Sequence, residues 1–258
     1  MPRVVQIPDI RRVDLPEARQ AIPHVHAYLR ECILNGTLSP GTKLSQVSLA
    51  AQLGISRTPL REVLRMLQEE GLVEIEPNQR TRVAGLDPQE LDDVYASRIL
   101  LETMALSMTI GHFGPKERAE AKRMLTAMRR AARTGDFDAW FGAHTGYHRV
   151  CTAAAGETMQ RQLRAFADRT TRYIRIYQAS EPGSWQTAGD AEHAAILEAL
   201  IADDERGALT EMAHHLERTA VRVLADCAPC SSPAISASRI AACSASPAVC
   251  QLPGSDSW

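Results

Sequence analysis

The sequence predicts a mainly α-helical protein in two parts: a small domain of three helices with a β-hairpin, followed by an antiparallel all-helical bundle. Two observations predict this organisation. Apolar residues recur at helical spacing through most of residues 15–225. A strand-like pattern occurs in one short stretch, around residues 72–83. We expect the first domain to span residues 15–84 and the second to span residues 87–225.

The first two helices are defined by their apolar periodicity and by their ends. Apolar side chains repeat every three or four positions over residues 22–33, and Asn35-Gly36 then ends the helix. Ser45 is a suitable N-cap for a short second helix, because its hydroxyl can accept a bond from an unpaired N–H of the first turn. Gly54 closes that helix, since glycine adopts the left-handed conformation at low cost.

A third helix and a hairpin complete this domain. Ser56 can cap the third helix, which ends near Gly71. Residues 72–76 and 81–83 then favour two short strands around a turn at Pro77-Asn78. Three helices followed by a β-hairpin are the plan of a winged helix-turn-helix.

The remainder of the chain is a helical bundle and a tail. Glycine and proline interrupt the helical pattern at short intervals, as expected for antiparallel neighbouring helices. The helices are expected over residues 88–111, 115–134, 136–155, 157–179, 185–202 and 204–225. Residues 227–258 are rich in Ser, Ala and Pro with only two charged residues, a composition that predicts disorder.

Composition excludes several classes of protein. The chain has 258 residues and a net charge of −2, and no apolar run approaches the ~20 residues of a membrane helix. The N-terminus has no apolar segment typical of a secretory signal, so we expect a cytoplasmic protein. Four of the six cysteines lie in the tail, which argues against a disulfide scaffold. Their spacing also fits no standard zinc knuckle.

The start of the third helix has the side chains of a DNA-reading helix. Arg57 and Arg61 are four residues apart and share a face opposite the apolar stripe. Arginine can donate two bonds to guanine or to a phosphate. An isolated pair of arginines is usually only a solvated face, but here the pair lies within a helix-turn-helix-wing order. The expected contacts to double-stranded DNA are Ser56, Arg57, Thr58, Arg61 and, from the wing, Asn78, Arg80 and Arg82.

These residues carry a family resemblance. The run LAAQLGISRTPLREVL at 49–64, with EGLV at 70–73 and Pro77-Asn78, resembles the DNA-binding domain of GntR-type bacterial transcriptional regulators. The helical half is similar to the FCD (FadR C-terminal) ligand-binding domain. The resemblance implies a homodimer that binds a palindromic operator, usually as a repressor. Two positions depart from the family pattern: Val47 replaces a basic or polar residue, and Arg80 replaces a glycine of the wing turn.

A group of histidines in the second half points to a metal site. His144 and His148 are spaced i, i+4 on one predicted helix, so both rings project from one face. His193 and His215 lie on the two following helices, and ligands from separate helices can converge inside a bundle. Taken singly, each histidine is better explained as a core or surface residue. His214 is the alternative to His215 in register.

The resemblance strengthens the metal interpretation. Many FCD domains hold a divalent metal with an Asp and a His four apart on one helix, followed by a His on each of the last two helices. The matching positions are His148, His193 and His215, while His144 occupies the Asp position. Four nitrogen ligands without a carboxylate favour Zn, with Ni as a further possibility, over Mg, Ca or Mn.

The resemblance also implies a small carboxylate effector in the same cavity. The expected clamps are Arg98 on the first bundle helix and Arg172 on the fourth, because arginine pairs with carboxylates through two parallel bonds. Arg169 and Arg175 on the fourth helix are alternatives to Arg172. We therefore predict a ligand-responsive regulator that is not an enzyme. Two other functions stay open: a metal-dependent enzyme using the histidine cluster, and a DNA-binding protein whose bundle only dimerises.

Overall fold

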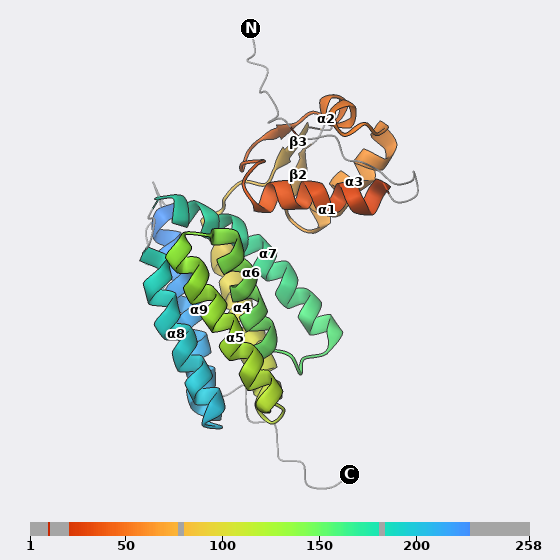
Figure 1. Ribbon diagram of the computed structural model, residues 1–258. Coiled ribbons are helices and arrows are strands. Elements are labelled where there is room, and N and C mark those ends of the chain that lie inside the picture. The colour runs from red at the N-terminus through yellow and green to blue at the C-terminus, as the bar shows by residue number, and fades with distance from the viewer. Residues whose placement is uncertain (1–9, 11–20, 77–79, 181–183, 228–258) are drawn as a thin grey trace, which may run out of the picture. The chain divides into compact units, whose positions relative to one another are not determined.

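The computed structural model describes residue 10 and residues 21–76, 80–180 and 184–227 (Figure 1). The described chain is mostly helical with one small antiparallel sheet, which confirms the predicted fold class. Two compact units divide it. The first comprises the residues up to Asp87 together with Asp168–Arg175, and the second comprises Pro88–Ala167 and the residues from Ile176 onward. No helix among the described residues has the length and apolar character needed to cross a membrane.

The first unit contains three helices and a three-stranded sheet. The helices are α1 (Ala21–Leu34), α2 (Gln46–Leu53) and α3 (Arg57–Glu69), and the strands are β1 (Lys43–Leu44), β2 (Val73–Glu76) and β3 (Arg80–Val83). The strand order is β1-β3-β2 and both pairings are antiparallel. The sequence predicted the hairpin of β2 and β3 but not β1, because two residues are too few to show an alternating pattern.

The ends of the short helices follow the predicted caps, with one exception. The Ser45 side chain accepts a bond from the backbone N–H of Ser48, and Gly54 ends α2 at φ 72°. Ser56 stands at the N-cap of α3 with an extended backbone, but its side chain makes no capping bond. Its hydroxyl is exposed and is not used by the helix, which leaves it for another acceptor or donor.

The core of this unit lies where the apolar faces of the three helices meet the sheet. Its fully buried side chains come from all three helices and include Leu29, Leu49, Leu53, Leu60, Leu64 and Leu67. Each such side chain contributes about 1.5–3 kcal/mol when it is removed from water. The apolar stripe of α3 is thereby held inside, and the opposite face of the helix is presented to solvent.

Six helices form the second part of the chain. They are α4 (Pro88–Ile110), α5 (Pro115–Thr134), α6 (Phe137–Cys151), α7 (Glu157–Ser180), α8 (Ser184–Ile201) and α9 (Glu205–Cys227). Five of them form a closed ring of neighbours, in which α4 packs on α9, α9 on α8, α8 on α5, α5 on α6 and α6 on α4. Helix α6 ends four residues earlier than predicted, because the backbone leaves helical geometry at Thr152.

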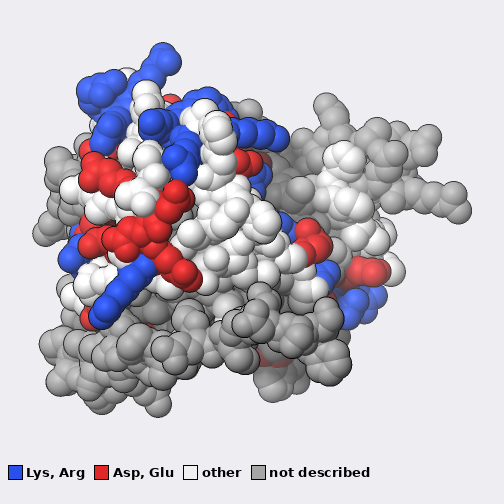
Figure 2. Space-filling model, turned by 90° about the horizontal axis from the view of Figure 1, so that it is seen from below, with Lys and Arg blue, Asp and Glu red and all other residues white. Residues whose placement is uncertain are grey.

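The surface charges of the bundle are mixed. On the face displayed in Figure 2, basic and acidic side chains lie in adjoining groups beside an uncharged area. Ion pairs join charged side chains on the surface of the bundle, such as Arg123 with Glu120 at 2.6 Å and Arg129 with Asp190 at 2.7 Å. A surface of mixed sign is not suited to following a phosphate backbone.

Candidate metal centre

Four histidines from three helices meet inside the bundle. His144 and His148 come from α6, His193 from α8 and His215 from α9, and one ligand atom of each lies within 4.8 Å of the others. All four side chains are buried. His215 belongs to the cluster and His214 does not, as the expected register required. The structure therefore brings together all four residues that the sequence singled out.

Three of these histidines are oriented through Nδ1. His148 donates from Nδ1 to Oε2 of Glu102 at 2.7 Å, and His215 donates from Nδ1 to Oε2 of Glu192 at 2.8 Å. His193 donates from Nδ1 to the carbonyl oxygen of Gly189. A bond at Nδ1 fixes the tautomer and leaves Nε2 as the free lone pair, which is the usual arrangement around a metal-ligating histidine.

The unpaired atoms point to the same use. Nε2 of His148 and Nε2 of His193 are buried and have no hydrogen-bond partner. A buried polar atom without a partner costs about 1–3 kcal/mol, so such atoms call for an explanation. A metal ion bound by the Nε2 atoms would satisfy both, and neutral imidazole is a preferred ligand of Zn²⁺.

Burial also keeps these rings neutral. Desolvation lowers the pKa of His144, His193 and His215 well below the usual range, and the neighbouring histidines lower it further. For Glu102, burial alone would raise the pKa, but Arg98 and His148 outweigh it and hold the pKa well below its usual range. The centre thus combines three rings that burial holds in the neutral form with an ionised carboxylate, and neutral rings are the form that binds a cation.

The low pKa values of the three histidines predict a pH-dependent stability for the metal-free protein. Below about pH 6.5 these histidines bind protons in the unfolded chain but stay neutral in the folded bundle. The free energy of unfolding therefore falls as the pH falls. At about 1.4 kcal/mol per proton and pH unit, three histidines give a slope of up to about 4 kcal/mol per pH unit. Urea unfolding of EDTA-treated protein at pH 7.5, 6.5 and 5.5 measures this slope.

Two variants sharpen this measurement. Replacing His193 with Gln removes one titrating ring and should reduce the slope by about a third. His112, which is exposed and lies outside the cluster, is the control position for the same substitution. A free energy of unfolding that stays constant from pH 7.5 to 5.5 would show that the folded bundle binds these protons as readily as the unfolded chain, contrary to the prediction.

Two arginines stand behind the carboxylates. Arg98 is buried on α4 and donates from Nε to Oε1 of Glu102 at 2.7 Å. Arg222 on α9 donates from Nη2 to Oε2 of Glu192 at 2.9 Å. From the sequence, Arg98 was expected only as an effector clamp, and Glu102 and Arg222 were not predicted. The i, i+4 spacing of Arg98 and Glu102 on one helix was the available signal.

Arg172, the second expected clamp, belongs to the first compact unit. Its guanidinium is buried and donates to the carbonyl oxygens of Ala84 at 2.8 Å and Gly71 at 3.4 Å. These bonds fix the backbone next to the β2–β3 hairpin, because Gly71 precedes β2 and Ala84 follows β3. An effector contact by Arg172 would require them to break, so the structure gives this side chain a structural role in place of the expected one.

The predicted DNA contacts on α3 are available at the surface. Ser56, Arg57, Thr58 and Arg61 are all exposed. On the wing, Arg82 is exposed but pairs with Glu74 at 2.7 Å and Glu76 at 3.0 Å, so it must exchange these partners to reach a phosphate. Asn78 lies outside the described residues, and for Arg80 only the backbone is described.

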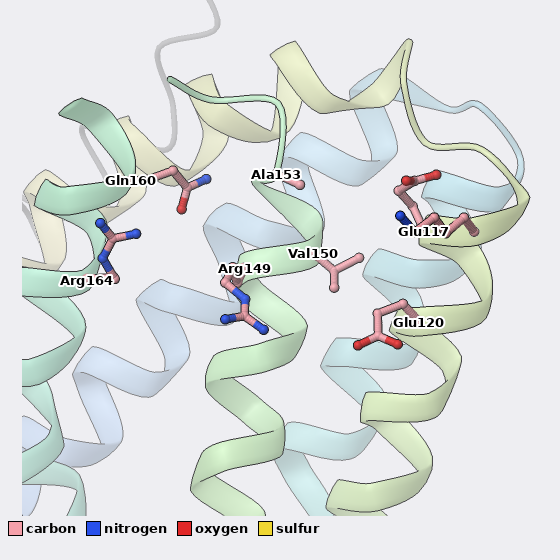
Figure 3. Close-up of a pocket in the computed structure, with 8 residues that line it drawn as sticks. Glu117, Glu120, Arg149, Val150, Ala153, Gln160 and Arg164 are labelled. Atoms are coloured by element: carbon pink, nitrogen blue, oxygen red, sulfur yellow. The ribbon is translucent and has the colours of Figure 1, made fainter. Parts of the chain in front are cut away.

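A surface pocket of about 350 Å³ lies elsewhere on the bundle (Figure 3). It is lined by α5, α6 and α7, and its charged residues are Lys116, Glu117, Glu120, Arg149 and Arg164. Much of this charge is used within the protein. Glu117 caps the start of α5, Glu120 pairs with Arg123, and Arg164 pairs with Glu157 at 2.7 Å. The four histidines do not line this pocket.

Comparison with known proteins agrees with the two parts of the structure. Residues 22–83 match the model of bacterial regulatory proteins of the gntR family, and residues 93–218 match the FCD domain. A probable D-xylose utilization operon transcriptional repressor of Paenarthrobacter nicotinovorans is 30% identical over 71% of this chain and 80% of its own length. The chain belongs to the GntR family. It is a DNA-binding transcriptional regulator.

A further relative and a solved structure are also similar to this chain. The transcriptional repressor GlaR of Escherichia coli is 28% identical over 74% of this chain and 90% of its own length. Among solved structures, E. coli McbR/YncC aligns with a TM-score of 0.67 and 22% identity, covering 77% of this chain and 94% of its own. That likeness concerns the fold.

Proposed function

We propose that this GntR-family protein is a repressor whose helical domain senses a small carboxylate metabolite through a bound divalent metal. The single observation that supports the sensor is the buried cluster of four histidines, with ligand atoms within 4.8 Å of one another. The resident ion is Zn²⁺, with Ni²⁺ as the second candidate, because an all-imidazole ligand set disfavours Mg²⁺, Ca²⁺ and Mn²⁺. Repression accords with relatives that are named repressors.

The effector binds as an anion beside the metal. Four neutral imidazoles leave the positive charge of a bound ion uncompensated by its ligands, which favours a carboxylate. Arg98 adds to this field, since its charge contributes to lowering the pKa of His144 and His215, after burial and the neighbouring histidines. Arg98 thus acts first as a partner of Glu102 and second as a source of positive potential for the effector.

Regulation requires that the effector distinguish two states of the protein. A ligand shifts an equilibrium only by the difference in its affinity for the DNA-competent and the DNA-incompetent arrangement. A homodimer presents two α3 helices to the two halves of a palindromic operator, and the spacing of those helices decides whether both can bind. The metal-bound effector would favour one spacing over the other.

Two other functions are less well supported. A metalloenzyme needs an open coordination position and a free general base. The two carboxylates that contact the ligand histidines, Glu102 and Glu192, are each engaged by a histidine and an arginine. A bundle that only dimerises gives no reason to bury four histidines with two unpaired Nε2 atoms.

Elemental analysis combined with a thermal-shift screen of small carboxylic acids tests the sensor. We expect about one equivalent of Zn or Ni per chain. One class of acid should raise the midpoint of the bundle by about 5–10 °C at a concentration of ~100 Kd. The same acid should have little effect after EDTA treatment, and its effect should return when metal is restored.

Two outcomes of these measurements would contradict the metal-dependent sensor. A protein that carries no metal after purification and reloading would show that the histidine cluster does not hold an ion. A thermal shift of equal size with and without EDTA would show that the effector binds independently of the metal. Either result would reject the metal-dependent sensor while leaving the DNA-binding assignment intact.

A further inference from the structure

The four histidines of the cluster are not equivalent, because they differ in the hydrogen bonds that their ring nitrogens make. Nδ1 of His148, His193 and His215 is held by Glu102, the Gly189 carbonyl and Glu192 respectively. Two of these acceptors are in turn bound by Arg98 and Arg222. Each of the three rings is therefore fixed in tautomer and in direction, so its Nε2 is committed to the centre.

His144 lacks such an anchor. Within the described part of the chain, neither ring nitrogen of His144 makes a hydrogen bond. The ring is instead stacked on the indole of Trp140, with centroids 4.8 Å apart and planes inclined by 18°, and Phe141 lies 6.2 Å away on the same helix. Stacking holds the plane of a ring but selects neither the tautomer nor the nitrogen that faces the ion. Loss of such an outer partner typically weakens metal binding by about 10–100-fold.

We propose that His144 is the exchangeable ligand of the metal centre, and that a small carboxylate binds by taking its place. This inference rests on the proposed metal site and adds to it the residue at which the effector acts. In the exchange, the bond from the ion to the His144 nitrogen breaks and a bond to a carboxylate oxygen forms. The imidazole leaves as a neutral ring with its lone pair, and no electron transfer or proton transfer is needed.

The charge balance favours this exchange. Three anchored imidazoles carry no charge, so the ion keeps its full positive charge after His144 leaves. An incoming carboxylate neutralises part of that charge in a buried site, where electrostatic attraction is weakly screened. Oxygen of Asp or Glu is an ordinary fourth ligand of Zn²⁺, so a carboxylate from outside the protein can fill the same position. The released ring remains supported by Trp140.

Cobalt-substituted full-length protein provides the test, because Co²⁺ takes zinc sites and its visible absorption reports the ligands. Acetate serves as the probe carboxylate. We compare the wild type with His144→Ala, with His144→Phe, which keeps an aromatic ring against Trp140, and with His193→Ala, which removes an anchored ligand. Both His144 variants should keep one Co²⁺ per chain with about 10-fold weaker affinity. His193→Ala removes a ligand together with its anchor, so its affinity for Co²⁺ should fall by more than the ~10–100-fold that loss of an outer partner costs.

The spectra decide between exchange and addition. Acetate should convert the wild-type spectrum to that of His144→Ala with acetate. His144→Ala should bind acetate about 10-fold more tightly, because no imidazole competes. The proposal is overturned if both His144 variants lose Co²⁺ as fully as His193→Ala. It is also overturned if acetate leaves the wild-type spectrum unchanged or produces a different spectrum. A wild type that binds no Co²⁺ would reject the metal centre itself.

Discussion

Alanine at both His148 and His193 should abolish stoichiometric metal in the purified protein, from about one ion per chain to a trace. These two rings are fixed through Nδ1, and their Nε2 atoms are buried without a hydrogen-bond partner. Removing both leaves His144 and His215, and two imidazoles cannot hold a divalent ion against chelation at neutral pH. The measurement is elemental analysis after dialysis, with circular dichroism to show that the bundle is still helical.

A neighbouring pair of histidines offers a matched control. His215→Ala should also lose the metal, whereas His214→Ala should keep it, because His215 lies in the cluster and His214 does not. The two variants remove the same side chain from adjacent positions of α9, so differences in helix propensity cancel. Retention of one ion per chain by the double variant at His148 and His193 would place the metal elsewhere in the protein.

Arg57→Ala should weaken operator binding by about 5–150-fold, which corresponds to ~1–3 kcal/mol for a bidentate contact to a base. Arg57 is the first residue of α3 and is exposed, while the apolar side of the helix is buried in the core. Its guanidinium can therefore reach base edges in the major groove. Affinity is measured at a fixed salt concentration on a duplex selected by the protein from random sequences, because phosphate contacts make binding strongly salt-dependent.

Arg65 is the control for this prediction. It is exposed on the same helix two turns further along and pairs with Glu69 at 2.7 Å. Arg65→Ala removes an equal charge away from the N-terminal end of α3, so operator affinity should change by less than about 3-fold. If Arg57→Ala binds the selected duplex as tightly as the wild type and with the same sequence preference, the base contact lies on another residue.

Local features were predictable because they depend on neighbours in the chain. The apolar repeat and its caps predicted α2 between Ser45 and Gly54, and the observed helix has both caps. The order of helices and hairpin, together with the motif at residues 49–64, predicted the winged helix and the GntR family. The i, i+4 spacing of His144 and His148 placed two candidate ligands on one face.

Contacts between distant segments were not predictable in the same way. The acceptors behind the ligands, Glu102 and Glu192, lie 46 and 23 residues from the histidines that they orient. Arg172 was expected at the effector and instead holds the Ala84 carbonyl, 88 residues away. Arg82 was expected on DNA and carries two ion pairs from the neighbouring strand. The apolar periodicity of a sequence indicates helices and strands but not which distant side chains will pair.

The sequence by itself therefore determined the helices and the hairpin of β2 and β3, the family and the four histidines of the candidate metal centre. Helix periodicity and capping act within a few residues, so their signals survive in the linear chain. Only the tertiary structure decided that three of the four rings are anchored and that His144 is not. That distinction arises because α4 packs against α6 and α8 packs against α9, which brings Glu102 to His148 and Glu192 to His215. The packing depends on the whole core.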